Sequence, residues 1–175
     1  MAGGALAAGS GQQDVDDLLP LALSRPHEAL ARARAVLTGR PGPYEASVAH
    51  QAAGIVLREV GDVYAGVREL RDALRLARRT GSTGREADVL ASLGVALVYA
   101  GRTADGLAAF DLAVQQSSGV LAGRVMVRRG MALWTLGRYA AALDDLRRAV
   151  SVLRRAGDPL WTARALSRTY QASSG

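Results

Sequence analysis

Three stretches of the sequence share one pattern, in which two glycines stand seven residues apart and a leucine lies three positions after the first glycine. They are Gly54-Ile-Val-Leu-Arg-Glu-Val-Gly61, Gly94-Val-Ala-Leu-Val-Tyr-Ala-Gly101 and Gly130-Met-Ala-Leu-Trp-Thr-Leu-Gly137. The first glycines stand at positions 54, 94 and 130. A period of roughly 36 to 40 residues predicts repeated structural units that stack on their neighbours.

The pattern continues downstream of each stretch at three further positions. They hold a small residue (Gly66, Gly106, Ala142), a large apolar residue (Leu70, Phe110, Leu146) and an alanine (Ala73, Ala113, Ala149). We expect each copy to form two antiparallel helices, here called helix A and helix B. A glycine inside helix A costs about 1 kcal/mol relative to alanine, and a close crossing of helix B at its small residue would explain it. The second glycine suits the left-handed backbone that ends a helix.

The composition favours an all-α fold. The 175 residues include 34 alanines and 24 leucines, and only 5% of them are aromatic; alanine and leucine lead the ranking of helix formers. A weaker first copy aligns Asp17 with Gly54, and a fifth copy starts at Pro159 and aligns Tyr170 with Gly130. We therefore predict nine helices in about four and a half pairs. They form one domain over residues 14–171, with flexible tails at 1–13 and 172–175.

Several classes of protein are excluded or disfavoured by what the sequence lacks. It has no cysteine, which excludes disulfide scaffolds, cysteine-ligated metals and cysteine nucleophiles. It has no uninterrupted apolar run long enough for a spanning helix, so no membrane contact is expected. The first residues lack the basic start and apolar core of a secretion signal. The expected location is the cytoplasm.

The basic residues are concentrated in the C-terminal third. All 22 are arginines. Residues 1–118 have net charge −1, whereas residues 119–175 hold ten arginines against three acidic residues, for a net charge of +7. The arginine pairs lack the interleaved aromatic residues of nucleic-acid readers. A nucleic-acid-binding solenoid is therefore a third and weaker hypothesis.

No catalytic, cofactor or metal site is predicted, and the chain is not expected to be an enzyme. His27 falls near the start of a helix B and His50 within a helix A, and neither has ligands at metal-binding spacing. Adjacent carboxylates at Asp144 and Asp145 point about 100° apart on a helix, so they do not form a paired acid and base. They are instead placed to meet the arginines at 147 and 148.

The repeat resembles the tetratricopeptide repeat (TPR). The matches are Leu93-Gly94, Gly130, the small residues at 66, 106 and 142, Phe110, and the alanines at 73, 113 and 149. The chain departs from the family pattern where helix A carries an aromatic residue (here His50, Leu90 and Met126) and a tyrosine (here Leu57, Leu97 and Leu133). The resemblance implies a right-handed superhelix of antiparallel helix pairs.

A narrower resemblance is carried by Arg25-Pro-His-Glu-Ala-Leu-Ala-Arg-Ala-Arg-Ala-Val-Leu37, Leu76-Ala-Arg-Arg-Thr-Gly81 and the stretch from Gly137 to Ala149. These segments are similar to the N-terminal repeats of large CHAT-domain (caspase-like) proteins of high-GC bacteria. The resemblance implies a sensing or docking arm that precedes a peptidase module. The peptidase dyad itself does not carry over, because the chain has no cysteine.

The TPR resemblance also implies a concave surface lined by one side of successive A helices. The positions that map to it here are Gln51, Ile55, Arg58, Glu59, Asp88, Val95, Val98, Tyr99, Arg124, Val127, Met131, Trp134 and Arg164. Aromatic residues, methionine and arginine are enriched at binding interfaces. We expect Tyr99, Met131 and Trp134 to be apolar anchors. Packing between A helices is an equally plausible role for each of these three.

The resulting functional hypothesis is a scaffold that binds a protein or peptide segment in this groove, with Arg58, Arg124 and Arg164 pairing with carboxylates of the partner. The identity of that partner is not specified by the sequence. The alternative is a spacer or self-association module without a groove ligand. The incomplete fifth pair favours this alternative, because it leaves Leu160, Leu166 and Tyr170 uncovered. Two copies of the chain could pair through this C-terminal helix to form a homo-oligomer.

Overall fold

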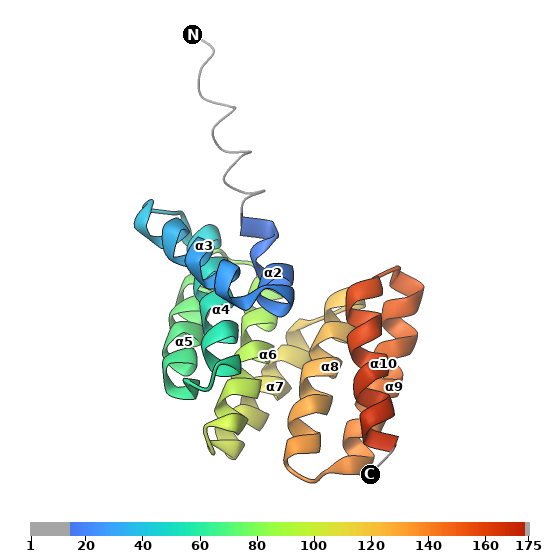
Figure 1. Cartoon of the computed structure of the whole chain (residues 1–175). Helices are drawn as coiled ribbons and strands as arrows, with labels where there is room; N and C mark the ends of the chain where they lie inside the picture. The colour runs from blue at the N-terminus through green and yellow to red at the C-terminus, as the bar shows by residue number, and fades with distance from the viewer. Residues whose placement is uncertain (1–14, 174–175) are drawn as a thin grey trace. The chain divides into compact units, whose positions relative to one another are not determined.

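The computed structural model describes residues 15–173, which contain nine α-helices and no strand (Figure 1). The all-α prediction is confirmed. The chain divides into two compact units, Met1–Ser82 and Thr83–Gly175, and each is described by itself. The predicted tail at 1–13 lies outside the described residues. None of the helices in the described part of the chain combines the length and the apolar character needed to cross a membrane.

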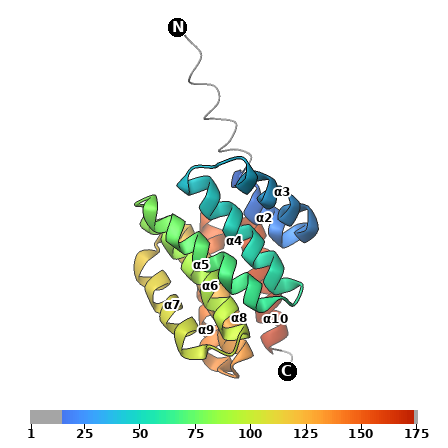
Figure 2. The same cartoon turned by 90° about the vertical axis from the view of Figure 1, so that its left-hand side faces the viewer.

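Unit 1 contains two helix pairs. Its helices are α2 (Leu18–Ser24), α3 (Pro26–Thr38), α4 (Pro43–Glu59) and α5 (Val63–Arg79). Helices α2 and α3 pack against each other and against α4, which matches the weak first copy predicted from Asp17. Their shared core includes the buried side chains of Leu18, Ala29 and Val56. Figure 2 shows α4 and α5 side by side along their lengths.

Unit 2 contains two further pairs and a single final helix. Its helices are α6 (Thr83–Tyr99), α7 (Thr103–Gln116), α8 (Gly119–Thr135), α9 (Tyr139–Ala156) and α10 (Pro159–Ser173). Each A helix contacts the next one, so α6 packs on α8 and α8 on α10. The backbone N–H of Trp161 donates to Asp158 Oδ1 (3.2 Å), and Pro159 follows at the first helical position, a favourable start for α10. Helix α10 extends two residues past the predicted end at 171.

The first glycine of each copy lies where two helices cross closely, as predicted. A Cβ atom placed on Gly54 would lie 2.5 Å from Cγ of Leu70 and 3.0 Å from the carbonyl oxygen of Gly66. In unit 2, a Cβ on Gly94 would lie 2.9 Å from the Phe110 ring, and one on Gly130 would lie 3.0 Å from Cγ of Leu146. Because each glycine of helix A has no side chain, it leaves space that a large residue of helix B fills.

The second glycine of each copy ends helix A, also as predicted. Gly61, Gly101 and Gly137 have φ angles of 96°, 77° and 74°, which suit glycine better than other residues. The next N–H closes the helix end by donating to the carbonyl of the repeated leucine, as Asp62 does to Leu57 (2.9 Å). This 6→1 bond is the Schellman arrangement. The chain can then reverse direction over three residues.

The close crossing in unit 1 gives a stability prediction. We expect Gly66→Ala to lower the free energy of unfolding by about 2 kcal/mol. The new Cβ would lie 2.8 Å from the carbonyl oxygen of Gly54 and 3.1 Å from the backbone nitrogen of Arg58. Both atoms belong to the backbone of α4, which cannot move away without separating the two helices. Chemical denaturation followed by circular dichroism measures the loss, and hydrogen exchange of α4 and α5 locates it. The reverse change, Ala142→Gly, is expected to cost only about 1 kcal/mol through helix propensity. A stabilised Gly66→Ala variant would contradict the tight crossing.

Candidate partner-binding site

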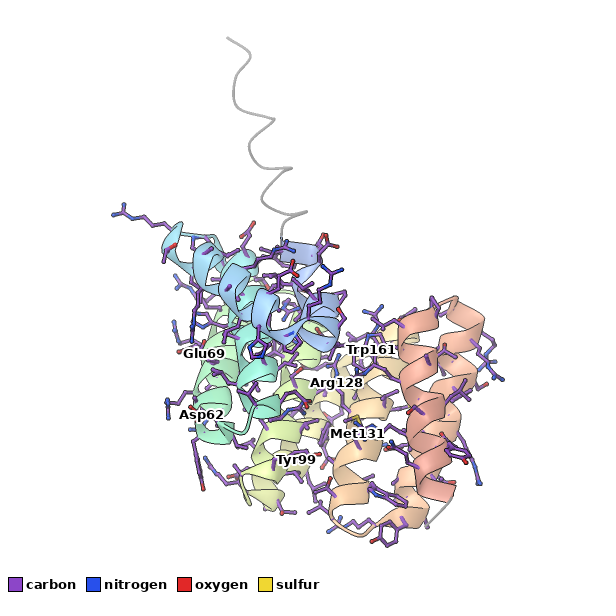
Figure 3. The ribbon with its side chains drawn as sticks, in the orientation of Figure 1. Asp62, Glu69, Tyr99, Arg128, Met131 and Trp161 are labelled. Atoms are coloured by element: carbon purple, nitrogen blue, oxygen red, sulfur yellow. The ribbon has the colours of Figure 1, made fainter. Side chains whose placement is uncertain are left out.

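A small cavity in unit 2 brings together three of the predicted anchor residues. Its volume is about 100 Å³, enough for one branched aliphatic side chain. The lining residues come from four helices and are Tyr99, Met131, Trp134, Thr135, Leu146, Arg168 and Gln171. Figure 3 labels Tyr99 on α6 and Met131 on the neighbouring α8. We call this feature the anchor cavity.

Helical spacing explains why these side chains share one cavity. Met131, Trp134 and Thr135 lie three and four residues apart on α8, so they occupy one face of that helix. Arg168 and Gln171 are three residues apart on α10, and the Arg168 Nη1 group donates to Gln171 Oε1 (3.1 Å). Tyr99 is the last residue of α6, where the helix end leaves half of its surface exposed (50%).

Trp134 is held in place by a second aromatic ring. The ring centroids of Trp134 and Tyr139 are 4.4 Å apart and the planes are inclined at 56°, a favourable aromatic arrangement. Tyr139 is the first residue of α9, so this contact crosses the connector between α8 and α9. Trp134 thus offers a partly exposed ring whose orientation is fixed before a ligand arrives, and this lowers the entropy cost of binding.

The chemistry of the anchor cavity suits an apolar side chain with a polar group beside it. Among the described residues that line it there is no carboxylate, and Arg168 is the one charged side chain. A guanidinium and an amide at the rim can bind the carbonyl or carboxylate groups of a peptide.

A buried network of charges joins α6, α8 and α10 in the same unit. Arg128 donates from Nη1 to the carbonyl oxygen of Asp88 (2.8 Å) and from Nη2 to Asp88 Oδ1 (2.6 Å). Arg85 approaches the other carboxylate oxygen of Asp88 at 3.4 Å. Two guanidinium groups lie over the Trp161 ring, that of Arg128 at 4.8 Å and that of Arg164 at 5.5 Å from the ring centroid. Figure 3 labels Arg128 and Trp161.

The arginines predicted to pair with a partner already have contacts within the chain. Arg124 forms an ion pair with Asp158 (2.7 Å), and Arg58 pairs with its neighbour Glu59. Arg164 lies against the Trp161 ring. A pair such as Arg124 on α8 and Asp158 in the connector before α10 cannot be predicted from helical spacing, because the two residues are 34 positions apart in the chain.

Met131, which lines the anchor cavity, is buried at 9% exposure, and two further predicted groove residues are interior. Gln51 has no exposed surface and Val95 is 1% exposed, so the expectation that they line an accessible surface is corrected. Val98 and Val127 of the same stripe are also buried. Ile55 packs against the core of unit 1. Every residue of α6 from Val89 to Val98 is buried. This stretch is almost entirely apolar in sequence, so it offers no polar face that would indicate which side of the helix is exposed.

Four residues of the anchor cavity were not predicted as site residues. Leu146 was predicted only as the large packing residue of helix B, and Thr135, Arg168 and Gln171 were not predicted at all. A signal for two of them was present. The offset that leads from Gly54 to Gly94 also leads from Met131 to Gln171 and from Arg128 to Arg168, so one further copy of the repeat register reaches both. Thr135 had no such signal. It follows Trp134 on the same helix, and its Oγ1 donates to the carbonyl of Met131 (3.1 Å).

Of the titratable residues considered in the sequence analysis, His50 and Asp145 have structural partners. His50 Nδ1 lies 2.6 Å from Glu69 Oε2, and His27 is exposed. Asp145 accepts two hydrogen bonds from Arg129 on α8 (2.6 and 2.8 Å), not from the nearby arginines of its own helix as expected. This bond is the main reason that the pKa of Arg129 is raised above its ordinary value. Between residues 15 and 173, no three histidine or acidic side chains are grouped so that they could hold a metal ion.

Comparison of the sequence with protein-family models and with curated proteins gives no match to either. The function is therefore inferred from the residues and their geometry.

Proposed function

We propose that this protein is a helical-repeat scaffold of the TPR type, with a right-handed superhelical arrangement of its pairs, which binds a peptide or protein segment at the anchor cavity. One observation carries this proposal. Tyr99 comes from one copy of the repeat, and Met131 and Trp134 come from the next copy. All three are predicted as anchors from the sequence register, and they line the same cavity. If these residues served only for packing, we would expect them to fill the space between the helices. They instead leave a cavity beside the half-exposed side chain of Tyr99.

The proposed binding mode follows from the lining. An aliphatic side chain of the ligand enters between Met131 and Leu146, and the rings of Tyr99 and Trp134 cover its sides. Arg168 and Gln171 bind the polar backbone next to that side chain. The resemblance to CHAT-type arrays supports a role as the cytoplasmic docking arm of a larger bacterial protein.

Selection of a random peptide library on the full chain, followed by titration of the tightest peptides, tests the proposal. We expect Trp134→Ala and Tyr99→Ala each to weaken binding about tenfold or more, as for central aromatic anchors in other interfaces. The matched control is Tyr64→Ala on α5, which removes a tyrosine that is 69% exposed in unit 1 and should leave affinity unchanged. Circular dichroism should show full helix content in all three variants.

Different results would contradict the proposal in different ways. Peptides that bind both anchor variants as tightly as the original chain would show that the anchor cavity is not the site. Loss of helix content in Trp134→Ala would assign that ring to the core, and Tyr99→Ala would then decide the question. Steeply salt-dependent binding to random RNA, unaffected by either variant, would favour the nucleic-acid alternative.

A further inference from the structure

Helix α10 has an apolar face that the helices of its unit leave exposed. The side chains of Leu160 and Leu166 are exposed, and Tyr170 is 76% exposed. The opposite face packs on α8 and α9 through the buried Ala165 and the partly buried Trp161. Because 163, 166 and 170 recur at helical spacing, Ala163 lies on the same face as Leu166 and Tyr170.

In the preceding A helix, the corresponding face is covered by helix B. Helix α8 begins at Gly119 and α10 begins at Pro159. When these two starts are aligned, Ala163 and Tyr170 take the positions of Gly123 and Gly130. A Cβ on Gly123 would lie 2.9 Å from Cγ of Leu153, a residue of α9. The exposed face of α10 therefore corresponds to a surface on which a second helix packs in the other copies. We call this face, formed by Ala163, Leu166 and Tyr170, the seat. The described residues do not supply a helix that covers it.

At the crossing position, α10 carries a large residue, whereas three other A helices carry a small one. In α4, α6 and α8 the crossing position is glycine, and the facing residue is Leu70, Phe110 or Leu146. In α10 the same position is Tyr170. A leucine placed opposite Tyr170 at the usual helix separation would collide with its ring, because a well-packed contact does not accept the added volume. A helix that fits α10 must have a small residue there.

Charge indicates what kind of helix fits. Residues 146–175 hold six arginines and one acidic residue, Asp158, whose carboxylate is already paired with Arg124 (2.7 Å). An open groove of about 550 Å³ runs beside the exposed face and is lined in part by Arg154, Thr162 and Leu166. Because Arg154 of α9 lies beside this face and the surrounding sequence is strongly basic, an acidic helix is attracted to this surface.

We propose that the exposed face of α10 binds an acidic amphipathic helix of a partner protein, which completes the fifth pair and carries a small residue opposite Tyr170. The seat uses Ala163, Leu166 and Tyr170, none of which lines the anchor cavity. The two proposals can therefore fail independently.

Synthetic helical peptides in the register of α9 (Tyr139–Ala156) test this proposal with the full chain. Each arginine of the peptide is replaced by glutamate, and the position of Leu146 carries alanine in one peptide and leucine in the other. We expect the alanine peptide to bind about tenfold more tightly than the leucine peptide. Tyr170→Ala should reverse this preference, and Tyr170→Phe should keep it. Leu166→Glu should abolish binding of both peptides, whereas Tyr64→Ala should not change it.

Three results would overturn the proposal. The first is equal affinity for the two peptides in both the original chain and Tyr170→Ala. The second is equally tight binding of a peptide in which the glutamates are replaced by lysines. The third is a concentration-dependent dimer, seen by sedimentation, that Leu166→Glu dissociates, because a second copy would then occupy the seat. Circular dichroism of the variants confirms folding, which substitution of exposed side chains should preserve.

Discussion

Replacing Phe110 by alanine is expected to lower the free energy of unfolding of unit 2 by about 3–5 kcal/mol, the usual cost of removing a fully buried aromatic side chain. Phe110 has no exposed surface, and its ring fills the space that Gly94 leaves on α6. The loss combines lost apolar burial with an empty cavity between α6 and α7. Both tryptophans of the chain, Trp134 and Trp161, belong to unit 2. Urea denaturation followed by tryptophan fluorescence therefore measures this change.

A companion substitution tests whether the two positions form one contact. Gly94→Leu alone should also destabilise unit 2, because even a Cβ atom would lie 2.9 Å from the ring. In the double variant, the new leucine can occupy the space that the ring vacates. We expect the double variant to lose less stability than the sum of the two single losses, by about 1–3 kcal/mol. Strict additivity would mean that the glycine is not a hole for this ring.

Asp88→Ala is the second substitution with a large expected effect, a loss of about 3–5 kcal/mol. The side chains of Asp88, Arg85 and Arg128 are only 13%, 7% and 10% exposed. Removal of the Asp88 carboxylate leaves the guanidinium groups of Arg85 and Arg128 close together and mostly buried. The negative charge that both groups contact is then missing. The contact between α6 and α8 should weaken, and the Trp161 ring should shift because Arg128 lies against it.

The matched control for Asp88→Ala is Asp105→Ala on α7. Asp105 also pairs with an arginine three residues away, Arg102, but both side chains are about half exposed. Such a pair contributes about 0–1 kcal/mol. Tryptophan fluorescence should therefore show a clear fall in denaturation midpoint for Asp88→Ala and little change for the control. Equal losses in the two variants would show that burial of the Asp88 network adds nothing to stability.

The local features of the fold could be predicted from sequence because their causes are local. A glycine with positive φ at Gly61 or Gly137 ends a helix whatever surrounds it. The crossing of Gly54 with Gly66 lies within one helix pair, and it follows from the offset that each copy repeats. The division at Ser82 had no comparable signal. Gly81 has the same positive φ as the glycines inside pairs, so the connector there looks like any other.

The candidate site could be predicted only in part, because exposure depends on contacts far apart in the chain. Tyr99 and Val95 lie one helical turn apart on α6, but Val95 is buried and only the helix end leaves Tyr99 exposed. Arg124, which we expect to contact a partner, also pairs with Asp158, which precedes α10. Register places residues on a face, but it does not show which neighbour covers that face.

The three-residue connectors of the helix pairs also govern how the chain folds. The residues at 60–62, 100–102 and 136–138 join helices that pack directly on each other. Closing such short loops costs little chain entropy, and folds dominated by contacts between near neighbours in sequence form rapidly, within roughly microseconds to milliseconds. The contacts within each hairpin of helices can therefore form early, and they become stable once a neighbouring pair covers the remaining apolar faces.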